Sequence, residues 1–127
     1  MPLKGYKKLD VWRKGIEIVE LIYEISKKLP KEERYGLTSQ MQKAAISIPS
    51  NIAEGYSRGY RKEFHRFCQM ALGSCSELET HMIIADRQGY LLNEDFTKLE
   101  ECLSYESRML WKLIKSLRKQ KQSIQIT

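Results

Sequence analysis

The chain has 127 residues, of which 42% are hydrophobic and 30% charged, and its 22 Lys and Arg outnumber its 16 Asp and Glu to give a formal net charge of +6. This composition excludes a disordered chain, and the length suits one domain over residues 1–127 that needs no metal or disulfide support. No membrane-length apolar run or hydrophobic signal core is evident and the cysteines number only three, so we expect a cytoplasmic protein with no membrane partner.

The first predicted helix covers residues 9–29 and ends before Pro30. Apolar residues recur there every three or four positions, but they form two stripes rather than one. An apolar arc this wide exceeds what a single core contact requires. We therefore expect one side to face the chain's own core and the other to face something outside it. The stripes are Leu9, Trp12, Ile16, Val19 and Tyr23, and Val11, Ile18, Ile22, Ile25 and Leu29.

The second predicted helix covers residues 36–57 and contains a proline, Pro49. Proline inside a helix typically costs about 3 kcal/mol and leaves the carbonyl of Ala45 without its donor. The apolar stripe keeps its phase on both sides of Pro49, which favours a continuous, kinked helix held by its neighbours. The alternative is a helix that ends near Ile46 and restarts at Pro49, with Asn51 and Glu54 resembling a capping box.

The third and fourth predicted helices cover residues 61–88 and 93–120. Residues 64 to 85 carry apolar side chains at alternating steps of four and three, the heptad seam of a bundle helix, and Gly89 stops the helix. The fourth helix has an acidic first turn and a basic end, which suits the helix dipole. Since the connections are short, consecutive helices are antiparallel neighbours. The predicted fold is an all-α, up-and-down four-helix bundle.

Two stretches resemble the signature of the 23S rRNA intervening-sequence protein family, also called four-helix bundle proteins. They are QMQKAAISIPSNIAEGYSRG and EFHRFCQMALGSCSEL, and the resemblance extends from LDVW at residues 9–12 over nearly the whole chain. Members are small bacterial proteins, often encoded within insertions in large-subunit ribosomal RNA genes. They are similar in fold to the accessory protein of diversity-generating retroelements, a basic homopentamer that binds nucleic acid and a reverse transcriptase.

This resemblance implies a ring-like homo-oligomer, with five subunits favoured. It places the second face of the first helix, and the polar line from Ser47 to Glu54, at subunit contacts. The candidate interface or motif residues are Trp12, Ser47, Pro49, Asn51, Glu54 and Gly55.

Basic residues gather at the turn into the third helix and along the end of the fourth, where no acid follows Glu106. The cations at the turn could bind phosphate groups. Tyr56 and Tyr60 lie beside them in the sequence, and their rings could stack on unpaired bases. The fourth helix presents a cationic stripe at intervals of three and four residues. The alternative is a solvated turn and an ordinary solvated helix end. The candidate nucleic-acid-binding residues are Arg58, Arg61, Lys62, Arg108, Lys112, Lys115, Arg118 and Lys119.

No residues have the spacing of a metal or catalytic site, so we expect no cofactor and no enzymatic activity. The cysteines fit core packing, and Glu77 with His81 fits a structural pair. Gly73 and Ser74 are expected to permit close helix crossing, and Gly55 and Gly59 to serve the turn. Two hypotheses follow. The chain binds RNA or other nucleic acid, mainly non-specifically through phosphates, or it is an oligomeric scaffold for a protein such as a reverse transcriptase or a ribosome-associated factor.

Overall fold

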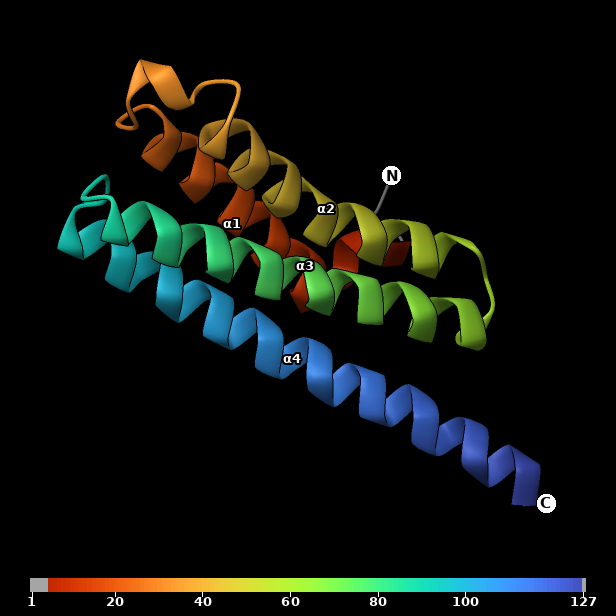
Figure 1. Ribbon diagram of the computed structural model, residues 1–127. Coiled ribbons are helices and arrows are strands. Elements are labelled where there is room, and N and C mark those ends of the chain that lie inside the picture. Colours follow the sequence, from red (N-terminus) through yellow and green to blue (C-terminus); the bar gives the residue numbers. More distant parts are fainter. Residues whose placement is uncertain (1–4, 127) are drawn as a thin grey trace.

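The computed structural model describes residues 5–126, with side chains up to residue 118, and these residues form helices without any strand. Four long helices lie side by side with successive helices antiparallel, and α4 returns to pack against α1 (Figure 1). The predicted all-α four-helix bundle is confirmed. The elements are η1 (Gly5–Lys8), α1 (Asp10–Ser26), η2 (Lys31–Glu33), α2 (Leu37–Ser57), α3 (Arg61–Arg87) and α4 (Asn93–Ile126).

Two helix ends differ from the predicted ranges by more than one residue. Helix α1 ends at Ser26 because the chain tightens there: the backbone N–H of Lys28 donates to Ile25 and that of Leu29 donates to Ser26. Such i to i−3 bonds satisfy the last carbonyls before Pro30, which disfavours helical geometry in the residue before it. Helix α4 continues past residue 120 to Ile126 and is longer than the helices beside it (Figure 1).

Helix α2 runs through Pro49 without a break. The prediction of a continuous helix is therefore correct, and the alternative, a helix that restarts at Pro49, is wrong. Polar side chains on both sides of the proline bond to the helix backbone: Ser47 Oγ donates to the carbonyl of Ala44 at 2.7 Å, and Asn51 Nδ2 donates to the carbonyl of Ser47 at 2.8 Å. The buried proline ring lies against Gly15 of α1. Packing on a neighbouring helix thus offsets the missing hydrogen bond.

The core lies along the four helices and is made mainly of Ile, Leu, Met and small residues. In α3 the predicted heptad seam is buried from Cys68 to Ala85, where its members are at most 1% exposed, whereas its first member, Phe64, is half-buried. In α1 only one of the two apolar stripes is buried, which leaves the stripe of Trp12, Ile16 and Val19 partly exposed. The bundle therefore uses one side of α1 for its core, as the sequence predicts.

Two glycines have roles other than those expected. Gly55 lies within α2, where an added Cβ would be only 2.5 Å from Cβ of Phe67, so its missing side chain lets α2 and α3 approach each other. Gly73, expected to permit a close crossing, is exposed and has no atom within 4 Å of the position of a Cβ. Of the expected pair at 73 and 74, only Ser74 meets α2: its hydroxyl oxygen lies 2.6 Å from that of Ser47.

None of the helices in the described part of the chain combines the length and the apolar character that a bilayer span requires.

Candidate nucleic-acid interface

The turn between α2 and α3 is set by a glycine in the left-handed region. Gly59 has φ of +80°, which reverses the chain after Arg58, and its N–H donates to the carbonyl of Tyr56 at 3.3 Å. Tyr60 then adopts an extended conformation, and its carbonyl accepts the N–H of Phe64 at 2.9 Å to begin α3. Tyr60 and the basic residues that follow it are thereby presented at one end of the bundle.

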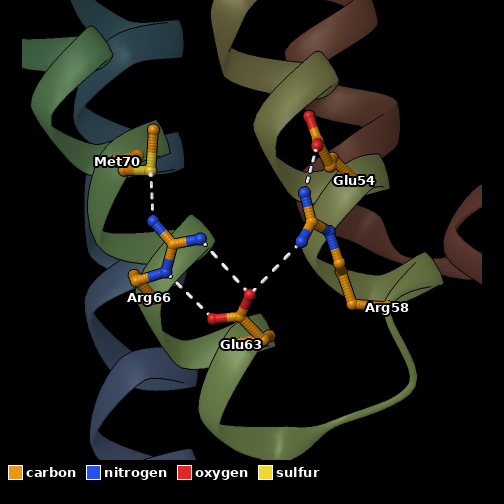
Figure 2. A network of polar contacts seen from close by, with 5 residues as sticks. All are labelled: Glu54, Arg58, Glu63, Arg66 and Met70. Carbon is orange, nitrogen blue, oxygen red and sulfur yellow. Dashed lines mark hydrogen bonds and ion pairs between the residues drawn. The ribbon is translucent and has the colours of Figure 1, made fainter.

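Arg58 is held in an ion-pair network across this turn (Figure 2). Its guanidinium contacts Glu54 at 2.7 Å and Glu63 at 3.5 Å, and Arg66 binds the same Glu63 carboxylate at 2.9 Å. The hydrogen bond from Arg66 is the main reason that the pKa of Glu63 is lowered. Both guanidinium groups also lie over the ring of Phe67, at 5.1 and 4.6 Å from its centroid. Two cations and two carboxylates leave this network with no net charge.

The next two basic residues, Arg61 and Lys62, are exposed and form no ion pair with any described residue. Arg61 borders a pocket of about 380 Å³ that joins the turn to α4. Tyr56 and Phe64 meet edge to face in its wall, with ring centroids 5.5 Å apart and planes at 88°. The remaining lining residues are Gly59, Tyr60 and Leu117.

On α4, the predicted cationic residues Arg108, Lys112, Lys115 and Arg118 are all exposed, whereas the side chain of Lys119 lies outside the described residues. Sequence reasoning missed Trp111, which lies on the same face and is 47% exposed. Lys115 Nζ lies 5.7 Å from its ring centroid, a cation–π contact. The spacing could have revealed it, since Trp111 is three residues from Arg108 and four from Lys115, and residues so spaced share a helix face.

Arg108 differs from the other members of this face. It borders a groove of about 820 Å³ between α3 and α4 whose lining also includes Glu79, Glu100 and Glu101. These carboxylates oppose a phosphate ligand at Arg108. The cations that stay clear of acidic neighbours are therefore nearer to the end of the bundle, at the α2–α3 turn and in α4 from Lys112 onward.

The candidate interface residues make contacts within the chain. Ser47 links α2 to Ser74 of α3, Pro49 packs on Gly15, and Gly55 packs on Phe67. Asn51 bonds to its own helix, and Glu54 is exposed and pairs with Arg58. Trp12 is half-buried and stacks at a tilt on Tyr6, with ring centroids 5.4 Å apart.

The partly exposed stripe of α1 forms one wall of a groove of about 280 Å³ whose described lining residues carry no charge. The opposite wall comes from α2, and η1 closes one end. The lining residues are Tyr6, Trp12, Ile16, Val19, Ile46, Pro49, Ser50 and Ala53.

A carboxyl group that sequence reasoning missed lies in the core. Glu106 of α4 is completely buried, and neither of its oxygens has a hydrogen-bond partner among the described residues. Burial raises its pKa to about 8, with Lys14 acting in the opposite direction and Glu17 in the same direction. Lys14 gives little relief because its Nζ binds Glu17 at 3.0 Å. The sequence does contain a sign of this buried acid: the apolar seam of α4 has a gap between Leu103 and Leu110, and Glu106 lies in that gap.

The buried thiols show no sign of activation. Burial, with a smaller effect from Glu106, raises the pKa of both Cys68 and Cys75 to about 12. His81 Nδ1 has no hydrogen-bond partner among the described residues, so the expected pairing with Glu77 is not formed. Within residues 5–118, no three His, Cys, Asp or Glu side chains are grouped to hold a metal ion.

Comparison with known proteins gives a matching family model and similar solved structures. The model of the family described as 23S rRNA-intervening sequence protein matches residues 7–112. A crystal structure from Bacteroides thetaiotaomicron, described as a protein with unknown function from the S23 ribosomal protein family, superimposes with a TM-score of 0.76 at 24% identity, covering 83% of this chain and 98% of the other. No curated protein matches the chain.

Proposed function

Because the chain belongs to the 23S rRNA-intervening sequence protein family, we propose that it is a non-catalytic, cytoplasmic nucleic-acid-binding protein that contacts RNA phosphates from one end of the bundle. The observation that carries this proposal is the set of exposed cations without carboxylate partners among the described residues. Arg61 and Lys62 lie at the α2–α3 turn, and Lys112, Lys115 and Arg118 lie on α4. Arg58 is not included, because Glu54 and Glu63 already neutralise it.

Phosphate contacts predict a binding mode that depends on salt and little on sequence. Each cation that meets a phosphate releases a condensed counterion, so the logarithm of affinity should fall linearly with the logarithm of salt concentration. Five such contacts on a single-stranded RNA correspond to a slope of roughly −3.5, at about −0.7 for each contact. This slope estimates the number of contacts without a structure of the complex.

The test is RNA binding measured by fluorescence anisotropy between roughly 50 and 300 mM salt, a range wide enough for the slope to be measured. Reversing the charges of Arg61 and Lys62 to Glu should weaken binding and flatten the slope. Reversing Lys31 and Arg34 to Glu is the matched control, since both are exposed cations near the opposite end of α2. Absent binding at low salt, or affinity that does not change with salt, overturns the proposal.

The proposal includes assembly of several copies through the groove between α1 and α2. Its lining is uncharged, and Trp12, Ile16 and Val19 remain partly exposed there. A second copy covering this groove would bury the partly exposed stripe of α1. The ring of five copies suggested by the family resemblance would have a mass of about 75 kDa, five times 15.0 kDa, and would pool the positive charge of each chain.

Light scattering tests the assembly. We expect a mass several times 15.0 kDa for the unmodified chain and a lower mass for Ile16→Asp, which places a charge in the groove. Ile83→Asp is the control, because Ile83 is an exposed isoleucine of α3 that does not line this groove. A stable 15.0 kDa particle at micromolar concentration overturns the assembly.

One observation favours a second candidate, a scaffold for a protein partner. The groove between α3 and α4 contains Glu79, Glu100 and Glu101, which repel nucleic acid and suit a basic protein segment. Affinity purification from the native host distinguishes the two functions. A stoichiometric partner that survives nuclease treatment and high salt favours the scaffold, whereas a partner lost on nuclease treatment favours RNA binding.

A further inference from the structure

The pocket between the α2–α3 turn and α4 has walls that suit a flat, aromatic ligand. Tyr56 and Phe64 meet edge to face, and this arrangement holds both rings in place. Tyr60 borders the same pocket and is 71% exposed, so most of its ring is open to a partner. Leu117 supplies an aliphatic surface from α4. The volume of about 380 Å³ is near the lower end of ligand pockets and suits a single heterocycle.

The charge around this pocket suits an anion attached to that ring. Among the described lining residues, Arg61 is the one that is charged, and none carries a carboxylate. The acids nearest in sequence, Glu54 and Glu63, are occupied by Arg58 and Arg66 in the network of Figure 2. Lys62 follows Arg61, and Arg118 follows Leu117, and both are exposed. A ligand entering here meets positive charge on the turn and on α4.

We propose that this pocket binds one unpaired base of a single-stranded nucleic acid, stacked on Tyr60, with Arg61 at the adjoining phosphate. This inference rests on the proposed function and adds a preference for unpaired over paired strands. A base inside a duplex already has both faces stacked and cannot enter, so duplex RNA is limited to the surface phosphate contacts. A single strand can use both the pocket and the cations. Stacking on an aromatic ring is tolerant of sequence, which suits recognition without a fixed motif.

The experiment compares single-stranded and duplex RNA of about ten nucleotides, within the span of known stacking sites, with the full chain at roughly 50 mM salt. We expect Tyr60→Ala to weaken single-strand binding roughly five- to tenfold and leave duplex binding unchanged. Tyr60→Phe keeps the ring and should bind as the unmodified chain does. Tyr35→Ala is the matched control: Tyr35 is 88% exposed, lies before α2 at the other end of the bundle, and has Arg34 5.5 Å from its ring.

A strand with abasic sites distinguishes the contribution of the bases to the affinity from that of the phosphates. It keeps every phosphate, so it should bind the unmodified chain as weakly as the complete strand binds Tyr60→Ala. If single strand, abasic strand and duplex bind equally and Tyr60→Ala changes nothing, this inference is overturned while phosphate binding stands. If no RNA binds, both proposals fail. If Tyr60→Ala instead lowers the mass of the assembly, the pocket is a contact between copies, which also overturns the inference.

Discussion

Replacing Glu106 by Gln should stabilise the bundle at alkaline pH and have little effect at acidic pH. The side chain is fully buried and its two oxygens lack hydrogen-bond partners among the described residues, so the folded chain favours the neutral acid. In the unfolded chain the same group is solvated and ionises normally. Glutamine has nearly the same shape and cannot ionise, so it isolates the effect of the charge.

The magnitude follows from the two pKa values. The ordinary value is 4.5 and the folded value is about 8, and each pH unit between them corresponds to about 1.36 kcal/mol. Because the folded pKa is the higher one, the folded state holds the proton longer, and stability falls as pH rises. The loss begins near pH 4.5, is complete a little above pH 8, and amounts to about 5 kcal/mol. Folded domains have only about 5–15 kcal/mol in total, so this loss is large.

The assay is urea unfolding of the two proteins at a series of pH values from about 4.5 to 9, chosen to span both pKa values. The free energy of unfolding of Glu106→Gln, minus that of the unmodified chain, should increase by about 5 kcal/mol across the series. Subtracting the two curves removes titrations common to both proteins. Glu100→Gln, which removes an exposed carboxyl group from the same helix, is the control for the substitution itself.

A difference that does not change between pH 5 and pH 8 would refute the reasoning, since it would mean that Glu106 ionises in the folded chain as it does in water. A difference that increases toward acidic pH would have the wrong sign and would imply that the folded bundle stabilises the carboxylate, for example through Lys14.

The other predictions concern close packing and thiol chemistry. Gly55→Ala should lower the free energy of unfolding by about 1–3 kcal/mol in urea unfolding, because its Cβ would lie 2.5 Å from a side-chain carbon of α3. Gly73→Ala, where a Cβ meets nothing within 4 Å, should stabilise α3 by about 0.5–1 kcal/mol, and a similar loss at both glycines would contradict the packing argument. Burial raises the pKa of the Cys68 and Cys75 thiols to about 12, so at pH 8 they should react with a thiol reagent only after unfolding, whereas half-buried Cys102 should react in the folded chain. Fast labelling of all three thiols in the folded chain would show that the core opens.

The fold was predictable because the apolar periodicity is long and regular. In α3 the alternating steps of four and three identify the buried residues from Cys68 to Ala85, although they miss buried Phe67, and short connections leave only antiparallel neighbours. Continuity through Pro49 could be favoured from the unbroken phase of the stripe. What holds the proline could not be predicted, since its contact with Gly15 joins two helices whose register the sequence does not specify.

The candidate site was less predictable because exposure and pairing depend on contacts between elements. Arg58 and Arg61 look equivalent in the sequence, yet Arg58 is neutralised across the turn by Glu63 and Arg61 is not. The pocket likewise needs Leu117 of α4 beside Tyr60, residues far apart in the chain. Glu106 could have been found from the gap in its seam, but its lack of a partner is visible only once the helices are assembled.

The contact between Gly15 and Pro49 makes two distant positions depend on each other. A Cβ at position 15 would lie 3.2 Å from Cβ of the proline and 3.3 Å from its backbone nitrogen. Alanine at 15 therefore requires α1 and α2 to separate by a few tenths of an ångström while the proline is present, and it meets less resistance once the proline ring is gone. The effects of the two substitutions are accordingly not additive, and neither position can be judged from its own tolerance.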